Sequence, residues 1–258
     1  FSNAIILGSS TTDNYYRNML TFLPRIFFIN EKEINIAIHR NSSNKWRIFI
    51  SDIFRQLKIK VKKYIYLDDD FYVFNKSQIP QFFDESASIK ILKKCLFTKQ
   101  KENKLKIYVS RQNSRSRNLI NEEDIIDEMK SKNFMIIDTK NMSIFEQIDI
   151  FSSAQIIIGP TGSALTNIIF CSEGTKIIEI VPKYNFGYEQ TFKNRYSRIC
   201  NILNLNYKFI EADPVENVKL NSNTEIGKFI SKKVLSESNY YKDLLIKKNK
   251  FKNLIKSY

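Results

Sequence analysis

The sequence predicts an α/β fold with two Rossmann-like domains, and three observations support this prediction. Short β-branched runs alternate with amphipathic stretches along most of the chain, which is typical of βαβ units around a parallel sheet. The chain has 258 residues, a length that accommodates one large domain or two domains of about 130 residues each. Its hydrophobic content of 43% is enough for a sizeable core and excludes global disorder.

The first half of the chain holds apolar runs separated by amphipathic stretches. The β-branched content of the runs favours strands, and the spacing of apolar residues between them favours helices. Strands are expected at 4–7, 34–38 and 64–67, and helices near 14–29, 45–57 and 86–97. Residues 68–100 are less regular, and the segment LDDDFYVFN is expected to form a loop and a strand.

The second half shows the same alternation more clearly. Strands are expected at 106–109, 134–138, 155–158 and 176–181, and helices at 121–132, 143–153 and 162–170. Acidic residues in its first turn favour the helix at 121–132, because they interact well with the helix dipole. Ser143 followed by Glu146 is a capping-box pattern at the start of the next helix. A polar stretch at 99–104 joins the halves, so domains are expected at 1–100 and 101–230.

Residues 231–258 form a basic tail with eight Lys and two acidic residues. Its apolar residues, which include Leu244 and Phe251, are expected on one face of a helix. Two interpretations stay open. The helix packs back on the body of the protein, or it lies on a membrane surface with its lysines facing the headgroups.

The composition narrows the function classes. With 41 Lys+Arg, 27 Asp+Glu and one His, the formal charge is +14, which favours phosphates, nucleic acid or an anionic membrane, or serves solubility. No apolar run approaches the 18 residues of a transmembrane helix. The first residues lack the features of a signal peptide, and the missing initiator Met leaves open that the chain is part of a longer protein.

The number and spacing of cysteines and histidines argue against several kinds of site. Cys95, Cys171 and Cys200 are widely spaced and odd in number, which argues against a disulfide scaffold and favours a reducing cytoplasm. With His39 as the single histidine, His-rich zinc sites and Ser–His or Cys–His catalysis have little support.

The segment IIIGPTGSALTNIIF at 156–170 joins an apolar strand to a helix through a tight turn. Gly159 ends the strand, and Gly162 and Ser163 open the helix, where small residues let a ligand approach the backbone. The free N–H groups and the dipole of a helix start favour an anion such as a diphosphate. The segment is neither a Walker loop nor GxGxxG, and plain tight packing stays open as an alternative.

The segment YVSRQNSRSRNLIN at 108–121 places arginines beyond the end of a strand. The strand ends in Ser110 and Arg111, and Arg115 and Arg117 follow in a polar loop. Guanidinium groups at the carboxyl end of a strand suit phosphate recognition, because each offers a planar fork of donors. A solvated basic loop is the alternative.

Glu179 lies in the apolar strand KIIEIVP. Its carboxylate should point away from one apolar face, and near the strand end it is a candidate acceptor for ribose hydroxyls. The alternative is an ion-paired or exposed Glu on a half-buried strand.

Together these segments resemble glycosyltransferase family 61. The similarity rests on the Arg-rich segment running into Asn121-Glu122, on Glu146-Gln147 in a helix, and on the segments GPTGSALTN and KIIEIVP. The N-terminal NYYRNMLTFLPRIFF also resembles a segment of the family. The similarity covers about residues 4–182 and is most specific over 108–182.

The resemblance implies a GT-B fold, in which two Rossmann-like domains face a central cleft. It implies an inverting, metal-independent transferase that moves a sugar from a nucleotide-sugar donor, without a further cofactor, to a glycan or lipid-linked acceptor. Bacterial members imply capsule or surface-polysaccharide synthesis. The donor would bind the C-terminal half, and the acceptor would enter from the N-terminal half. The resemblance implies donor-binding roles for Arg111, Arg117, Gly162, Ser163, Asn167 and Glu179. Their neighbours in the two loops complete the expected donor site: Ser110, Arg115, Gly159 and Thr161.

Two departures from the family pattern concern the general base. Arg17 and Thr161 stand where the family often has His. An inverting transferase needs a group that removes a proton from the acceptor hydroxyl. Asp13 is the candidate base, with Arg17 as a second catalytic candidate. The run at 68–70, three aspartates, is interpreted as a loop.

Two other functions stay open. A catalytically degenerate relative that binds a nucleotide sugar or glycan would explain the missing His residues. A nucleic-acid-binding protein would explain the charge and the 13% aromatic content, but no helix-turn-helix, RRM or KH pattern occurs, so no nucleic-acid partner is expected. The expected location is the cytoplasm, with peripheral attachment to the anionic inner membrane as an option.

Overall fold

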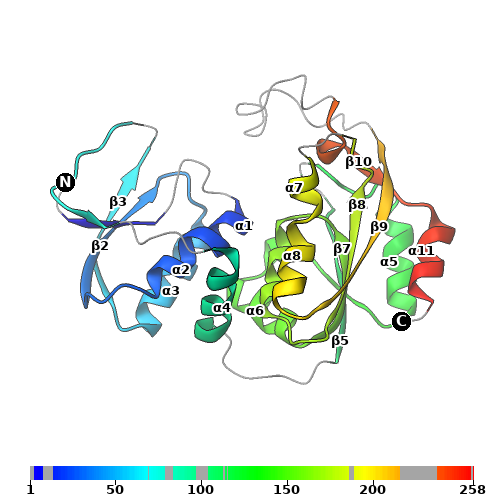
Figure 1. The fold of residues 1–258 in the computed structure, drawn as a ribbon, viewed down its shortest axis with the longest axis horizontal. Coiled ribbons are helices and arrows are strands. Elements are labelled where there is room, and N and C mark those ends of the chain that lie inside the picture. Colours follow the sequence, from blue (N-terminus) through cyan, green and yellow to red (C-terminus); the bar gives the residue numbers. More distant parts are fainter. Residues whose placement is uncertain are drawn as a thin grey trace. The chain divides into compact units, whose positions relative to one another are not determined.

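The computed structural model describes residues 3–7, 14–68, 70–78, 84–96, 104–112, 114, 116–185, 189–215, 237–256 and 258. It has the predicted α/β fold, with a mostly parallel sheet in each of two compact units (Figure 1). The first unit comprises Phe1–Lys99 and Ser143–Asp149, and the second comprises Gln100–Met142 and Ile150–Tyr258.

The sheet of the first unit has the strand order β3-β2-β1-β4, and all its strand pairs are parallel. Its strands are β1 (Ala4–Ile6), β2 (Glu33–His39), β3 (Lys60–Leu67) and β4 (Ser77–Gln78). The strand expected within LDDDFYVFN is wrong for the described residues. The fourth strand lies just beyond that segment, because Ser77 and Gln78 are the residues that pair with β1.

The helices of the first unit follow the predicted periodicity. They are α1 (Tyr15–Arg17), the π-helical η1 (Asn18–Phe22), α2 (Leu23–Ile26), α3 (Asn44–Gln56) and α4 (Glu85–Leu96). Ser43 caps α3 by accepting the Trp46 N–H at 3.3 Å. One face of α3 is buried at helical spacing through Trp46, Phe49, Ile50, Ile53 and Phe54.

The sheet of the second unit has the strand order β10-β9-β8-β7-β5-β6. Its strands are β5 (Leu105–Val109), β6 (Met135–Ile137), β7 (Ala154–Pro160), β8 (Lys176–Pro182), β9 (Asn206–Val215) and β10 (Asp243–Leu245). All pairs are parallel except β9 with β10, which is antiparallel.

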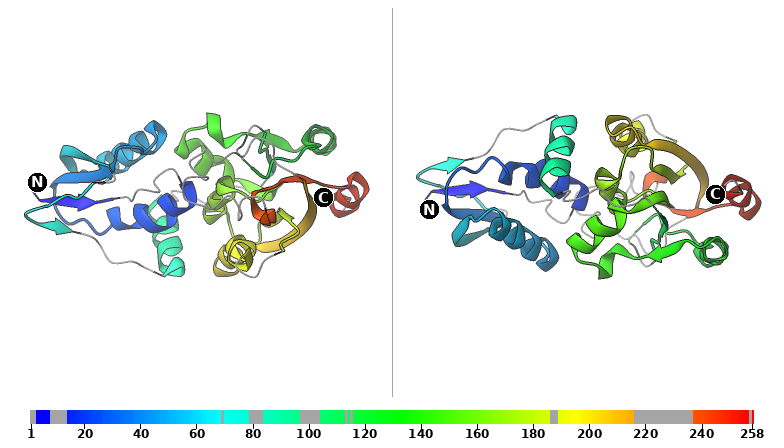
Figure 2. Two further views of the ribbon diagram at one scale, coloured as in Figure 1. Left: turned by 90° about the horizontal axis from the view of Figure 1, so that it is seen from above. Right: turned by 90° about the horizontal axis from the view of Figure 1, so that it is seen from below.

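Helices cover both faces of this second sheet (Figures 1 and 2). On one face, α5 (Glu122–Ser131) and α11 (Lys248–Ile255) pack on a core that includes Ile156, Ile178 and Ile180. The other face carries η3 (Ser163–Phe170), α7 (Gln190–Lys193) and α8 (Arg195–Ile202). Between β6 and β7 the chain also forms η2 (Thr139–Asn141) and α6 (Ile144–Ser152), and α6 spans the boundary between the two units. A parallel sheet covered in this way is buried on both sides, which explains its continuous apolar runs.

Two local predictions for the second half can be compared directly with the structure. The capping box of α6 is confirmed, because the Ser143 N–H donates to Glu146 Oε2 at 2.6 Å and the Glu146 N–H donates to Ser143 Oγ at 3.2 Å. The segment after the glycine turn is helical, as predicted, but η3 is a 3-10 helix.

The tail differs from the single amphipathic helix that was expected. Its described part contains η5 (Asn239–Tyr241), β10 and α11, and Leu244 lies in a strand because β10 pairs with β9. Phe251 and Ile255 of α11 are fully buried in the core, so the apolar face of this helix packs on the body. None of the described helices is long and apolar enough to span a bilayer.

Candidate functional site

The strand order of the second sheet creates a switch point between β5 and β7. β6 pairs with one edge of β5, and β7 pairs with the other edge. Open parallel sheets bind ligands outside the carboxyl ends of their strands at such a point. The loop after β5 carries the Arg-rich segment, and the loop after β7 carries the glycine turn.

Arg111 lies directly against Gly162. A Cβ atom on residue 162 would come within 2.1 Å of Nη1 of Arg111, so glycine at this position leaves room for the guanidinium. The Nε of Arg111 donates to the Ser116 carbonyl at 3.0 Å, and its backbone N–H donates to Glu122 Oε1 at 2.9 Å. The two motifs predicted to bind a diphosphate are therefore brought together.

Arg117 is buried, and its backbone is in the left-handed region with a φ of 59°, which costs energy for an L-residue. Its Nε donates to the Thr161 carbonyl at 3.2 Å, and its Nη1 donates to the Tyr240 carbonyl at 3.1 Å. The other described non-glycine residues with positive φ each follow a helix end, where this conformation is common: Lys58, Asn133 and Asn204. The exceptional backbone of Arg117 thus holds its side chain at the glycine turn.

Arg195 and Tyr240, which no sequence motif indicated, join this cluster. The Arg117 guanidinium lies 4.2 Å from the centroid of the Tyr240 ring. The Phe192 ring stacks on the same Tyr240 ring, with ring centroids 4.0 Å apart and an interplanar angle of 17°. Arg195 lies 5.1 Å from the Phe192 ring centroid and forms a hydrogen bond with the Tyr240 side chain. No local pattern could have found these contacts, since the residues come from segments far apart in the chain.

The arginines influence each other and the phenol between them. Burial, and then repulsion from Arg117, lower the pKa of Arg111 to about 9, which leaves it charged at neutral pH. Burial alone would raise the pKa of Tyr240, but Arg117, Arg195 and Arg111 outweigh it, so the pKa is lowered. The cluster is therefore a region of strong positive potential.

Glu179 points away from Ile178 and Ile180, as predicted, but it is fully buried because helices cover its face of the sheet as well. Its Oε2 accepts the Tyr207 hydroxyl at 2.7 Å. Thr161 also interacts with this carboxylate, yet Oε1 has no partner with hydrogen-bond geometry among the described residues. Burial raises the pKa of Glu179 to about 7, against the effect of these hydrogen bonds.

The Asn121-Glu122 pair organises the arginine loop. Glu122 Oε1 accepts the Tyr108 hydroxyl at 3.0 Å in addition to the Arg111 N–H, and burial raises its pKa. Asn121 donates through Nδ2 to the Ile246 carbonyl at 2.9 Å. Through these contacts Glu122 connects the arginine loop to Tyr108 of β5, and Asn121 connects it to the C-terminal segment.

The small residues of the glycine turn have packing contacts of their own. A Cβ on Gly159 would lie 2.9 Å from the Val109 carbonyl oxygen, so this glycine allows β7 to approach β5. Asn167 is buried and donates through Nδ2 to the Ala164 carbonyl at 3.1 Å. Ser163 is half-buried at the start of η3.

The remaining predicted residues have other contacts, lie in the first unit or are not described. Ser110 is half-buried at the end of β5, and its Oγ accepts the Gln112 N–H at 3.3 Å. Arg17 is exposed in α1 of the first unit. Arg115 and Asp13 lie outside the described residues.

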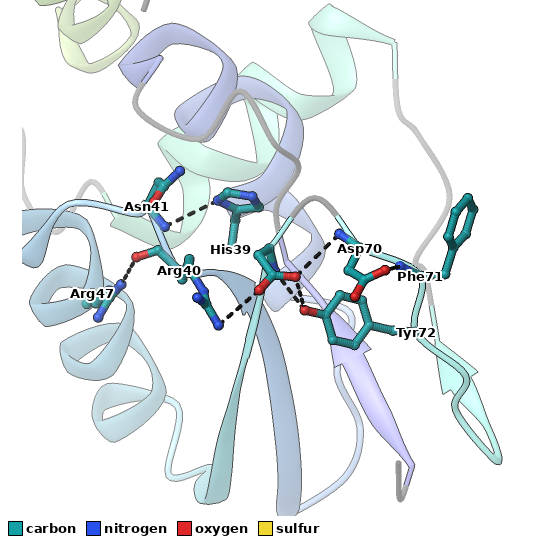
Figure 3. Close-up of polar contacts among 8 residues, drawn as sticks. His39, Arg40, Asn41, Arg47, Asp70, Phe71 and Tyr72 are labelled. Carbon is teal, nitrogen blue, oxygen red and sulfur yellow. Dashed lines mark hydrogen bonds and ion pairs between the residues drawn. The ribbon is translucent and has the colours of Figure 1, made fainter.

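A second polar cluster lies at the carboxyl ends of β2 and β3 in the first unit (Figure 3). Asp68 accepts the Tyr72 hydroxyl and pairs with Arg40 at 3.0 Å. The Tyr72 hydrogen bond, and then the Arg40 charge, hold the pKa of Asp68 below its ordinary value against the effect of burial. Asp70 bonds its own loop through the Phe71 N–H, and His39 accepts the Asn41 N–H at Nδ1. These contacts support the interpretation of the aspartate run as a loop.

The described part of the chain has no group of three or more His, Cys, Asp or Glu side chains arranged to hold a metal ion.

The family model described as Glycosyltransferase 61 matches residues 15–178. No curated protein matches the chain. The matched residues run from α1 into β8 and include the arginine loop and the glycine turn. Because the match covers well over half of its 258 residues, the chain belongs to glycosyltransferase family 61 and is a glycosyltransferase that acts on a sugar donor and a glycan acceptor.

Proposed function

We propose that the cluster of Arg111, Arg117 and Gly162 binds the diphosphate of a nucleotide-sugar donor. The observation that carries this proposal is the convergence of the guanidiniums of Arg111 and Arg117 on the glycine turn at the switch point of the second sheet. No ion pair of the described residues joins Arg111 or Arg117 to a carboxylate. An anion would therefore gain charge-assisted hydrogen bonds without displacing an existing acidic partner.

In this proposal the enzyme is an inverting, metal-independent transferase of the GT-B type. When the acceptor hydroxyl attacks the anomeric carbon, the bond to the leaving diphosphate breaks and negative charge develops on its oxygen. Preorganised guanidiniums stabilise that charge without having to reorient. The domain at 1–100 serves the acceptor and the domain at 101–230 binds the donor. The described part of the tail at 231–258 packs on the donor domain.

Residues of the first unit are proposed to activate the acceptor. Asp13 is the candidate base, and Arg17 is a second candidate catalytic residue. Asp13→Asn should leave donor affinity unchanged and lower turnover, because the amide cannot accept the proton. Full activity of this variant would remove Asp13 from the mechanism.

The biological role we propose is synthesis of a bacterial capsule or surface polysaccharide on a glycan or lipid-linked acceptor in the cytoplasm. Attachment to an anionic inner membrane would depend on lysine charge alone, because the apolar face of α11 is buried. The alternative is a relative that binds donor without turnover. It is favoured by Arg17 and Thr161 at the two positions where His was expected.

The test is a calorimetric panel of UDP, GDP, CMP and dTDP with their sugars, with and without EDTA. Tight binding of one nucleotide, unchanged by EDTA, is the expected result, and release or transfer of its sugar separates the enzyme from the binding module. Absence of binding by every nucleotide at millimolar concentration would overturn the proposed donor site.

A further inference from the structure

We propose that Arg195 and Tyr240 complete the anion site, with the Arg195 guanidinium and the Tyr240 hydroxyl as direct donors to the phosphates of the nucleotide. This inference rests on the proposed function and extends it to two residues outside the matched range of 15–178. It makes the C-terminal segment a part of the donor site.

The geometry places Tyr240 at the centre of the positive cluster. Its ring is enclosed between the Arg117 guanidinium and the Phe192 ring, at 4.2 Å and 4.0 Å. Its hydroxyl is hydrogen-bonded by Arg195, so the phenol lies where the two guanidiniums converge. A hydroxyl in this position can donate its proton to a phosphate oxygen while its own oxygen still accepts from Arg195.

The backbone of Tyr240 is tightly held by Glu189. Its N–H donates to Glu189 Oε1 at 3.2 Å, and the hydroxyl of Ser238 donates to the same oxygen. The other oxygen, Oε2, accepts the Asn185 N–H at 2.9 Å. A group presented by such a network loses little entropy when it binds a ligand, which is the condition for a preorganised site.

The carboxylates around the cluster accept hydrogen bonds from several donors. Glu189 bonds backbone and hydroxyl groups, Glu122 bonds Tyr108 and the Arg111 N–H, and Glu179 bonds Tyr207. Arg117 and Arg195 both contact the Tyr240 side chain, and Arg111 lies at the same glycine turn as Arg117. A diphosphate has enough charge and acceptor atoms to engage all three.

The experiment measures binding of inorganic pyrophosphate and of UDP, GDP and dTDP to the whole chain by calorimetry. Arg195→Gln should weaken binding of the preferred probe about tenfold or more and reduce its salt dependence. Arg198→Gln is the matched control, because Arg198 is exposed on the same helix and its loss changes the net charge equally. Its affinity should stay within about twofold.

Tyr240→Phe keeps the ring stack and removes the hydroxyl, so it should weaken the same probe by about tenfold. Tyr241→Phe removes a hydroxyl from the same turn and should leave affinity unchanged. Equal melting temperatures of each variant and its control exclude a folding defect as the cause.

Equal affinities of Arg195→Gln and Arg198→Gln, with Arg117→Ala still impaired, would overturn this inference and leave the proposed donor site standing. Absence of pyrophosphate and nucleotide binding to the unaltered protein would overturn both. Binding of pyrophosphate and of every nucleotide with one affinity would support a site for the phosphates alone, whereas preference for one nucleotide adds base recognition.

Discussion

The carboxyl edges of the two parallel sheets carry arginines in different electrostatic settings. In the first unit, Arg40 pairs with Asp68 at 3.0 Å, so the charge of this arginine is neutralised by a carboxylate. In the second unit, Arg111 and Arg117 donate to carbonyl groups and have no acidic partner among the described residues. The comparison teaches that position at a strand end is not sufficient for a ligand site. The site with uncancelled charge is the one that favours an anion.

The largest expected effect comes from removing an unpaired guanidinium. Arg111→Ala and Arg117→Ala should each weaken nucleotide binding by about 1.5–3 kcal/mol, because each loses charge-assisted hydrogen bonds to phosphate. Titration calorimetry measures this loss. Arg40→Ala in the first unit is the control and should retain full affinity. Unchanged affinity in both second-unit variants would break the comparison.

A second expected effect concerns the stability of the protein and depends on Glu179, the buried carboxyl group of the second unit. Because the folded pKa of Glu179 is about 7 and its ordinary value is 4.5, the folded protein binds more protons than the unfolded chain between these values. This contribution to stability is present below about pH 4.5 and is lost as the pH rises through about 7. Glu179→Gln should remove that loss, and thermal unfolding between pH 5 and pH 8 measures it.

The gain from Glu179→Gln at pH 8 relative to pH 5 should be on the order of 1–3 kcal/mol. Gln keeps an acceptor for the Tyr207 hydroxyl, so the hydrogen bond at this position can persist. An identical pH dependence in the variant and the unaltered protein would show that Glu179 stays charged in the fold.

Asp68→Asn in the first unit should have a smaller effect on stability, with a pH dependence opposite to that of Glu179→Gln. The lowered pKa of Asp68 means that its contribution is present above its unfolded pKa and is lost as the pH falls through its folded pKa. The variant should therefore melt slightly lower at neutral pH and equal the unaltered protein in acid. Nucleotide affinity should not change. A large loss of affinity would give this cluster a role in donor binding.

Changes in the tail are expected to have the smallest effect on nucleotide affinity. Two of its lysines already form ion pairs, Lys248 with Asp124 and Lys252 with Glu128. Reversing the charge of Lys247, Lys248, Lys250 and Lys252 should reduce binding to anionic vesicles without changing nucleotide affinity, since about 1 kcal/mol per basic residue near the surface is at stake. Vesicle sedimentation measures the first property. Unchanged sedimentation would remove the tail from membrane attachment.

Local features of the sequence were sufficient for much of the fold. The periodicity of α3 and the reciprocal pattern of Ser143 and Glu146 depend on residues within a few positions of each other, and both appear in the structure. The same holds for the apolar runs of β7 and β8. The strand expected within LDDDFYVFN was wrong because pairing with β1, rather than apolar content, determines where β4 forms.

The candidate site also has features that the sequence predicted and features that it could not predict. The order of residues along the chain determined that the arginine loop and the glycine turn each follow a strand, and a parallel sheet brings such loops to one edge. Sequence analysis also assigned Glu179 to the correct side of its strand. It could not determine that this side is covered, because burial depends on helices elsewhere in the chain.

By itself, then, the sequence determined the fold class, the resemblance to the family and the two motifs of the proposed donor site. The tertiary structure alone decided that Arg195 and Tyr240 join them, that the tail adds β10 to the sheet, and that no ion pair of the described residues joins Arg111 or Arg117 to a carboxylate. The physical reason is that charge neutralisation and burial are properties of neighbours in space. Residues more than a hundred positions apart in the sequence, such as Arg117 and Tyr240, leave no periodic pattern that would show they are in contact.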